Sequence, residues 1–276
     1  MLEQTIARIQ DLDQKALAAA TARQNTLTKP PGSLGRLEEL SIQLAGVSGK
    51  PIPSIKDKVI ITMAGDHGIV AEGVSAYPQE VTPQMVLNFL YGGAAINALA
   101  GHVGARIVVV DMGVAADMEP HPSLVIKKIA HGTANMAQGP AMTRQQAESA
   151  LVAGIEIITA EIEKGLDIVG TGDMGIGNTT PSAAIAAVLT GEAPAKIAGR
   201  GTGVDDDGLK RKIDAIERSI AVNQPDPKDG LDVLAKVGGF EIAGLAGVIL
   251  GAAAHGKAVM VDGFISAAAA MIAVAI

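Results

Sequence analysis

The sequence predicts an α/β protein with a largely parallel, Rossmann-like sheet and helices on both faces. Short apolar runs of strand length alternate with longer helical patterns along most of the chain. The 276 residues are 48% hydrophobic and include 33 glycines, but only 2% are aromatic, which indicates a closely packed core of Ala, Val, Ile, Leu and Met. Several of the apolar runs also end in an acid and a glycine, as strands do where they meet a ligand-binding loop.

The first 50 residues are predicted to be helical. Leu2, Ile6, Ile9 and Leu12 follow helical spacing, so we expect one amphipathic helix over residues 2–23. A Pro-Pro-Gly connector ends it, and Ser33 is a candidate cap for a second helix. We therefore expect residues 1–50 to form the N-terminal part of a small helical subdomain and residues 51–276 to form an α/β substrate-binding domain.

The remaining elements follow from apolar periodicity and turn signals. The expected strands are residues 58–63, 106–110, 125–129 at an edge, 166–169 and 258–261. The expected helices are one capped by Thr82, then residues 143–164, 180–189, 205–223, 229–237, 240–254 and 267–276. The acidic triplet at residues 205–207 suits a helix start, where negative charge is stabilised, better than a metal site.

The stretch from Leu166 to Thr180 is predicted to carry the ligand site. It reads as a strand, a loop over residues 170–177 with four glycines in eight positions, and a helix. Such a loop frees backbone N–H groups, and the helix start behind it favours an anion such as phosphate. A tight turn alone also explains the glycines, because the spacing matches neither the dinucleotide fingerprint nor a Walker loop. Asp173 favours the functional interpretation, since a carboxylate there suits proton transfer.

Four acids follow predicted strands: Asp66, Asp111, Asp173 and Asp262. In a parallel sheet the carboxyl ends of the strands share one edge, so we expect these acids to ring one pocket.

Composition excludes several functions. A net charge of −7 and the scarcity of aromatic residues argue against a nucleic-acid partner. There is no cysteine, the five histidines lack metal-ligand spacing, and no Gly-x-Ser-x-Gly elbow occurs. The uncharged runs at residues 242–254 and 264–276 are too short for a membrane span, and the N-terminus lacks a signal-peptide core. We expect a cytoplasmic protein without a membrane partner or metal.

Several motifs in order along nearly the whole chain resemble the nicotinate-nucleotide:dimethylbenzimidazole phosphoribosyltransferase family. They are Lys-Pro-Pro-Gly-Ser-Leu-Gly-Arg at 29–36, Ala-Gly-Asp-His-Gly at 64–68, Tyr-Pro-Gln-Glu-Val-Thr at 77–82, residues 135–143 with Gly-Pro-Ala-Met, residues 172–181, and Lys-Val-Gly-Gly-Phe-Glu at 236–241. The resemblance implies transfer of the 5-phosphoribosyl group of nicotinate mononucleotide to 5,6-dimethylbenzimidazole, without a cofactor, by a homodimer. The products are α-ribazole 5′-phosphate, with inverted configuration, and nicotinate, in the lower-ligand branch of cobalamin synthesis.

The resemblance also implies roles for individual residues. Asp173 is the catalytic carboxylate, at a position where the family most often has Glu. The residues expected to bind the phosphate and ribose are Gly175, Gly177, Asn178, Thr179, Gly201, Thr202, Gly203 and Lys212. The residues expected to line the acceptor-base pocket are Tyr77, Gln84, Met85 and Met174. The family's second glutamate, its expected general base, lies beyond Ile276, so we expect a C-terminal segment to be missing from this sequence.

Two alternatives to this activity remain. One is a related transferase that uses adenine or a phenolic ring as acceptor. The other is a nucleotide-binding protein without catalysis. A nicotinamide-dependent dehydrogenase is poorly supported, because the dinucleotide fingerprint is absent.

Overall fold

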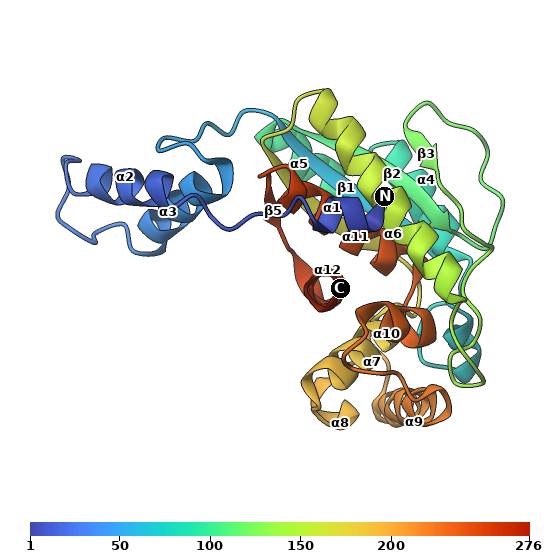
Figure 1. Ribbon diagram of the computed structural model, residues 1–276. Helices are drawn as coiled ribbons and strands as arrows, with labels where there is room; N and C mark the ends of the chain where they lie inside the picture. The colour runs from blue at the N-terminus through green and yellow to red at the C-terminus, as the bar shows by residue number, and fades with distance from the viewer.

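A computed structural model describes residues 1–276 and contains one five-stranded, all-parallel sheet in the order β3-β2-β1-β4-β5 (Figure 1). The strands are β1 Lys58–Gly65, β2 Ala105–Gly113, β3 Leu124–Ile126, β4 Ile168–Met174 and β5 Ala258–Met260. Every pairing is parallel, and β1 lies at the centre between β2 and β4. The predicted α/β class and the predicted edge strand are therefore confirmed.

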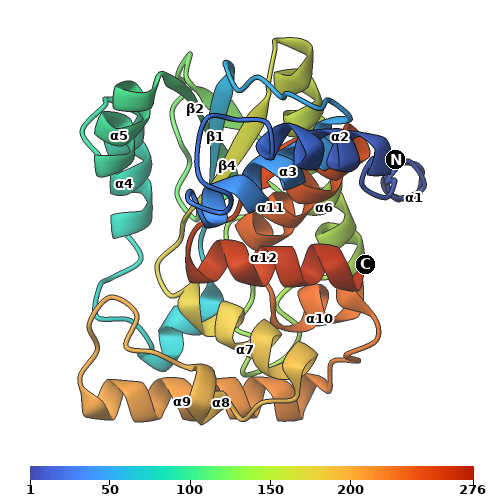
Figure 2. The ribbon, with the colours of Figure 1, turned by 90° about the vertical axis from the view of Figure 1, so that its left-hand side faces the viewer.

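The helices are α1 Leu2–Ile6, α2 Gln14–Gln24, α3 Arg36–Ser48, α4 Val81–Leu90, α5 Ala95–Val103, α6 Arg144–Glu163, α7 Thr179–Thr190, α8 Pro194–Ile197, α9 Asp206–Asn223, α10 Gly230–Val237, α11 Phe240–Ala254 and α12 Gly263–Ala275, with a 3-10 turn η1 at Gly68–Glu72. Helices α6 and α11 cover one face of the sheet, and α4 and α5 cover the other (Figure 2). Helices α7 to α10 form a tier beyond the carboxyl ends of the strands, with α12 packed on α7 and α10.

The single N-terminal helix predicted over residues 2–23 is wrong. Residues 7–13 leave the helix, and Asp13 starts α2 by accepting a hydrogen bond from the Ala16 N–H at 2.8 Å. The Asp13 N–H also donates to the Gly46 carbonyl of α3 at 2.9 Å. Helix α1 packs on α6 and α11, while α2 and α3 form a hairpin that projects from the body (Figure 1). A tertiary contact thus overrides the local apolar spacing.

Two predicted caps also differ from the structure. Gly35, with a φ of 53°, precedes α3 in place of Ser33. Thr82 lies inside α4, fully buried, and its hydroxyl accepts a hydrogen bond from the Ile176 N–H at 3.1 Å. In contrast, Asp205 caps α9 as predicted, accepting from the Gly208 N–H at 2.7 Å.

The segment Val81–Val103 is a longer uncharged stretch than residues 242–254 or 264–276; it has the length and hydropathy of a membrane span, and 22% of its most apolar window is buried. In the fold it is two helices separated by a turn at Tyr91. Val86 and Phe89 of α4 pack with Val109 of β2, so the apolar side of the segment is part of the core of the α/β body.

Helices α6 and α11 approach each other at glycines. A Cβ added to Gly154 would lie 2.0 Å from the Gly244 carbonyl oxygen, and one added to Gly247 would lie 2.0 Å from the Leu151 carbonyl oxygen. Only glycine permits this backbone contact, which places α11 close against the sheet and its first turn at the carboxyl edge.

Candidate active site

Strand β4 and helix α7 build the centre of the site. The strand continues through Gly170 and Gly172 to Met174, so the loop predicted over residues 170–177 is shorter than expected. The pairing of β4 with β1 explains this difference. Gly172 pairs with Thr62 of β1 in regular parallel register, and a Cβ at Gly172 would lie 2.9 Å from the Thr62 hydroxyl. The glycine therefore permits close packing within the sheet, and Asp173 ends a strand.

The true turn covers Gly175 to Asn178. A Cβ at Gly175 would lie 2.3 Å from the Gly65 carbonyl oxygen, and Gly177 has a φ of 85°. Helix α7 begins directly behind this turn, so its free N–H groups and its positive end face the space above the sheet. This arrangement suits an anion.

A cavity of about 330 Å³ lies in front of this turn. Its lining residues are Val74, Ser75, Asp173, Met174, Gly175, Ile176, Gly177, Asn178, Thr179, Gly201, Thr202 and Ile265. The cavity thus brings together eight of the predicted site residues from two glycine segments that are distant in sequence. The second segment follows the one-turn helix α8.

Lys212 lies behind the wall of this cavity. It comes from the buried side of α9, and its ammonium Nζ donates to the Thr179 hydroxyl at 2.5 Å. The whole residue is 1% exposed, and a Cβ at Gly201 would lie 3.1 Å from Nζ. Burial lowers the pKa of Lys212 to about 8. Because no carboxylate pairs with it, this cation is suited to an anionic ligand.

Asp173 provides the acid of the cavity. Its Oδ2 accepts a hydrogen bond from the Asn178 side-chain amide at 2.8 Å. Burial, with a smaller contribution from the nearby Glu241 carboxylate, raises the pKa of Asp173 to about 6, although the Asn178 hydrogen bond and the His67 charge oppose the rise. A carboxyl group of this kind changes protonation close to neutral pH, as a general acid or base requires.

Sequence reasoning missed a buried pair beneath Asp173. His67 Nε2 lies 2.7 Å from Glu241 Oε1, and the two side chains are 1% and 0% exposed. The residues are 174 positions apart, so no local motif joins them. A signal did exist: Glu241 is the sole charged residue of α11, an otherwise apolar helix.

The four acids at the strand ends share the sheet edge, but only Asp173 lines the cavity, so the expectation that all four ring one pocket is wrong. Asp66 accepts from the Ala115 N–H at 2.8 Å, and burial raises its pKa. Asp111 accepts from the Val114 N–H at 2.9 Å and lies 3.3 Å from Lys128 Nζ. These two acids fix backbone turns, and Asp262 is exposed at the start of α12.

The structure brings one of the four residues predicted for the acceptor base into the cavity lining. Met174 lines the cavity, and Met85 packs against the same apolar cluster as Met174. Tyr77 is 52% exposed, and its N–H donates to the hydroxyl of the cavity residue Ser75 at 3.2 Å. Gln84 is exposed on α4, and Gly203 is not part of the cavity lining.

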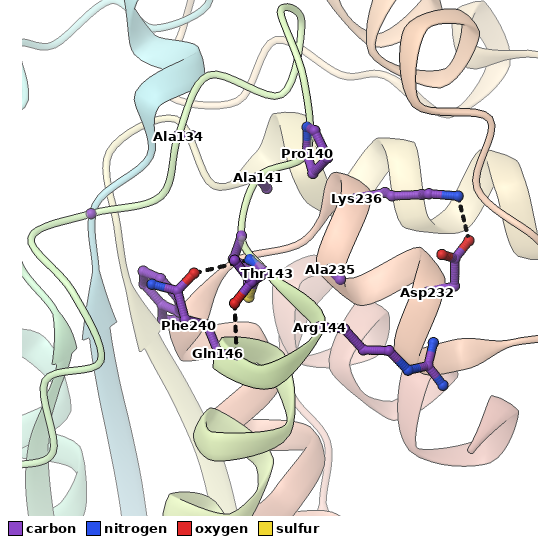
Figure 3. A pocket seen from close by; sticks show the side chains of 12 residues that line it. Ala134, Pro140, Ala141, Thr143, Arg144, Gln146, Asp232, Ala235, Lys236 and Phe240 are labelled. Carbon is purple, nitrogen blue, oxygen red and sulfur yellow. Dashed lines mark hydrogen bonds and ion pairs between the residues drawn. The ribbon is translucent and has the colours of Figure 1, made fainter.

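A larger cavity of about 500 Å³ lies between the 132–143 segment and α10 (Figure 3). Its two cations are already neutralised by acids: Lys236 Nζ lies 2.9 Å from Asp232 Oδ2, and Arg144 lies 2.7 Å from Asp229 Oδ2. The larger cavity is therefore less suited to a phosphate than the cavity at α7, where Lys212 lacks a carboxylate partner.

The fold and the cavity define an α/β protein with a site suited to an anionic small molecule, formed by a glycine turn, a helix N-terminus and a buried lysine. Comparisons with known proteins narrow this class. The profile of a family described as "Phosphoribosyltransferase" matches residues 9–276. The nicotinate-nucleotide–dimethylbenzimidazole phosphoribosyltransferase of Roseiflexus sp. (strain RS-1) is 60% identical over 273 residues, which are 99% of this chain and 77% of that protein.

Further relatives agree. The protein of the same name from Dehalococcoides mccartyi (strain ATCC BAA-2100) is 58% identical over 99% of this chain and 78% of its own length. The crystal structure of CobT from Thermus thermophilus superposes with a TM-score of 0.91 at 46% identity, covering 95% of this chain and 78% of that one. The chain belongs to the nicotinate-nucleotide–dimethylbenzimidazole phosphoribosyltransferase family.

Proposed function

We propose that this chain transfers the 5-phosphoribosyl group of nicotinate mononucleotide to 5,6-dimethylbenzimidazole. In this reaction a ring nitrogen of the benzimidazole forms a bond to the ribose C1′, and the bond from C1′ to the nicotinate nitrogen breaks with its electron pair. The benzimidazole then loses its proton to solvent water, and the products are α-ribazole 5′-phosphate and nicotinate. The observation that carries the proposal is one cavity lined by a carboxyl group with a pKa of about 6, Asp173, with the buried, carboxylate-free Lys212 directly behind its wall.

The lysine side of the cavity is assigned to the phosphate. Lys212 supplies positive charge through Thr179, and the N-terminus of α7 supplies backbone N–H groups. Gly175, Gly177, Asn178 and the segment Gly201–Gly203 form the walls on which phosphate and ribose rest. Together they hold the sugar in one position and orientation, as substitution at C1′ requires.

The carboxyl side is assigned to the chemistry. As C1′ loses its bond to nicotinate it gains positive charge, which the ionised Asp173 stabilises. Asn178 holds the carboxylate in one orientation through its 2.8 Å hydrogen bond. Tyr77, Gln84, Met85 and Met174 are assigned to the flat apolar acceptor.

The test is to incubate the purified chain with both substrates and to follow nicotinate and α-ribazole 5′-phosphate by chromatography with mass detection. We expect equal amounts of the two products. Ligand-induced thermal stabilisation without release of nicotinate would overturn the proposal in favour of a binding protein. Competition with adenine and a phenol in the same assay decides the acceptor.

We also propose that the chain acts in the cytoplasm as a homodimer, with residues 1–50 as part of a small subdomain. Support for the dimer comes from the projecting α2–α3 hairpin, where Leu34, Leu37 and Leu40 are 50%, 65% and 41% exposed. Exposed leucines on one segment suit contact with a second copy. Light scattering at two protein concentrations tests this, and the mass of a monomer at both would contradict it.

A further inference from the structure

The buried His67–Glu241 pair is enclosed by glycines from three parts of the fold. A Cβ at Gly239 would lie 2.4 Å from His67 Cε1, and one at Gly65 would lie 2.9 Å from Glu241 Oε2. A Cβ at Gly175, in the turn of the candidate site, would lie 3.1 Å from His67 Nε2 and 3.3 Å from Glu241 Oε1. The pair therefore lies directly behind the turn that carries Asp173.

The pair is incompletely satisfied by hydrogen bonds. Glu241 Oε2 and His67 Nδ1 are buried and have no hydrogen-bond partner in the protein. Unsatisfied buried polar atoms cost stability, so their presence beside a reactive carboxyl group indicates a role in function. Glu241 lies in the first turn of α11, where the helix dipole favours a carboxylate.

The charges around the imidazole are all negative. Glu241 faces it from α11, Asp66 precedes it in the chain, and Asp173 faces it from β4. Burial alone would lower the pKa of His67, but these three carboxylates outweigh burial and raise it. Around Asp173 the facing groups are Glu241, His67, Asp262 and the Asn178 amide, so His67 is the one cation of this set.

We propose that His67 and Glu241 are positioning residues that set the charge of the active site: the imidazolium, held by Glu241, keeps the Asp173 carboxylate ionised. This inference rests on the proposed phosphoribosyl transfer. The pair touches no substrate; it acts through Asp173 and through the turn at Gly175.

The first measurement needs no enzyme activity. The five histidines give separate ring-proton signals in an NMR titration, and the His67 signal is the one lost in His67→Gln. We expect its midpoint above the ordinary value of 6.5, and a lower midpoint in Glu241→Gln. A wild-type midpoint at or below 6.5 would overturn the proposal, because the buried ring would then be neutral at the pH of the reaction.

The second measurement is the pH profile of kcat/KM for formation of α-ribazole 5′-phosphate. His67→Gln leaves the Glu241 charge uncompensated, so the acid limb should move upward by about half a pH unit or more. Glu241→Gln removes the anion and also the partner that keeps His67 charged, so the limb should not move upward. A merely structural role would lower activity without this difference in direction.

The matched control is His131→Gln. His131 Nε2 forms a similar pair with Asp117 at 2.8 Å, but its side chain is 59% exposed, so the acid limb should stay at the wild-type pH. If His67→Gln fails to fold, the double variant His67→Gln with Glu241→Gln leaves no unpaired charge, and its limb should lie at or below the wild-type position. A limb equal to wild type in a folded His67→Gln would overturn the proposal, whereas inactive wild-type protein would overturn the proposed function and leave the NMR result to decide on His67.

Discussion

Lys212 and Thr179 join helices α9 and α7 through a 2.5 Å hydrogen bond that lies behind the wall of the cavity. The ammonium is buried and lacks a carboxylate, although the chain has excess acid overall. Burying a charge without a countercharge costs stability, and a protein keeps such an arrangement where a ligand supplies the missing charge.

The first prediction concerns this lysine. Lys212→Met keeps the length of the stem but removes the charge, and we expect nicotinate mononucleotide to bind about tenfold more weakly or worse, since hydrogen bonds to charged groups contribute about 1.5–3 kcal/mol. Calorimetry measures the affinity. Lys210→Met on the same helix is the control, because Lys210 is exposed and pairs with Asp207. Equal losses in the two variants would show that only net charge matters.

Although Lys212→Met should weaken ligand binding, we expect it to raise the free energy of unfolding. The pKa of Lys212 falls from 10.5 to about 8 on folding, which corresponds to about 3 kcal/mol against the folded state at neutral pH. Between pH 8 and 10.5 the unfolded chain holds a proton that the folded chain has lost, so the wild-type free energy of unfolding rises with pH there. After loss of the Thr179 bond, Lys212→Met should be about 2 kcal/mol more stable than wild type at pH 7, with the difference shrinking towards pH 10. Urea unfolding tests this, and a less stable variant at pH 7 would contradict it.

Sequence patterns predict those parts of the fold and the site that depend on neighbouring residues. The start of α9 is an example, because Asp205 caps it through a residue three positions away. The cavity around β4 and α7 was predictable for the same reason, since one strand, turn and helix provide most of its lining.

The parts that escaped prediction depend on distant contacts. The apolar spacing of Ile9 and Leu12 continues where the helix does not, because Asp13 bonds to Gly46 instead. Glu241 reaches His67 across 174 positions, and this contact exists only once α11 has packed against α6 at its glycines. Such close approaches follow from three-dimensional packing, which periodicity cannot encode.

A second prediction concerns Asp173. Asp173→Asn should lower kcat/KM by about 100-fold or more, as expected for loss of a catalytic carboxylate. Wild-type activity should fall as the pH drops through about 6, where the carboxylate becomes protonated, and the residual activity of the variant should lack this limb. Asp173→Glu is the control, because it retains the charge. An acid limb that persists in Asp173→Asn would assign it to another group.

A third prediction concerns the turn. Gly175→Ala places a methyl group 2.3 Å from the Gly65 carbonyl oxygen, so the turn must move away from β1. We expect about 2 kcal/mol of destabilisation from overpacking and at least a tenfold loss in kcat/KM. Thermal unfolding and steady-state kinetics measure the two effects. Gly199→Ala is the control, since a Cβ there has no neighbour within 4 Å. Full activity in Gly175→Ala would show that the turn tolerates displacement.

The last prediction concerns the contact that places α11. Gly154→Ala would put a methyl group 2.0 Å from the Gly244 carbonyl oxygen, and the backbone of α11 has no flexible end that can move aside. Alanine favours a helix over glycine by about 1 kcal/mol, but the clash outweighs this gain, and we expect a net loss of about 3 kcal/mol. Gly101→Ala in α5 is the control that measures the gain in helix propensity alone, because that glycine is exposed and a Cβ there has no neighbour within 4 Å. It should stabilise the protein by about 0.5–1 kcal/mol. Urea unfolding of both variants tests the argument: stabilisation of both would mean that α6 and α11 separate at little cost, and Glu241 would then owe its position to the turn at Gly239 instead.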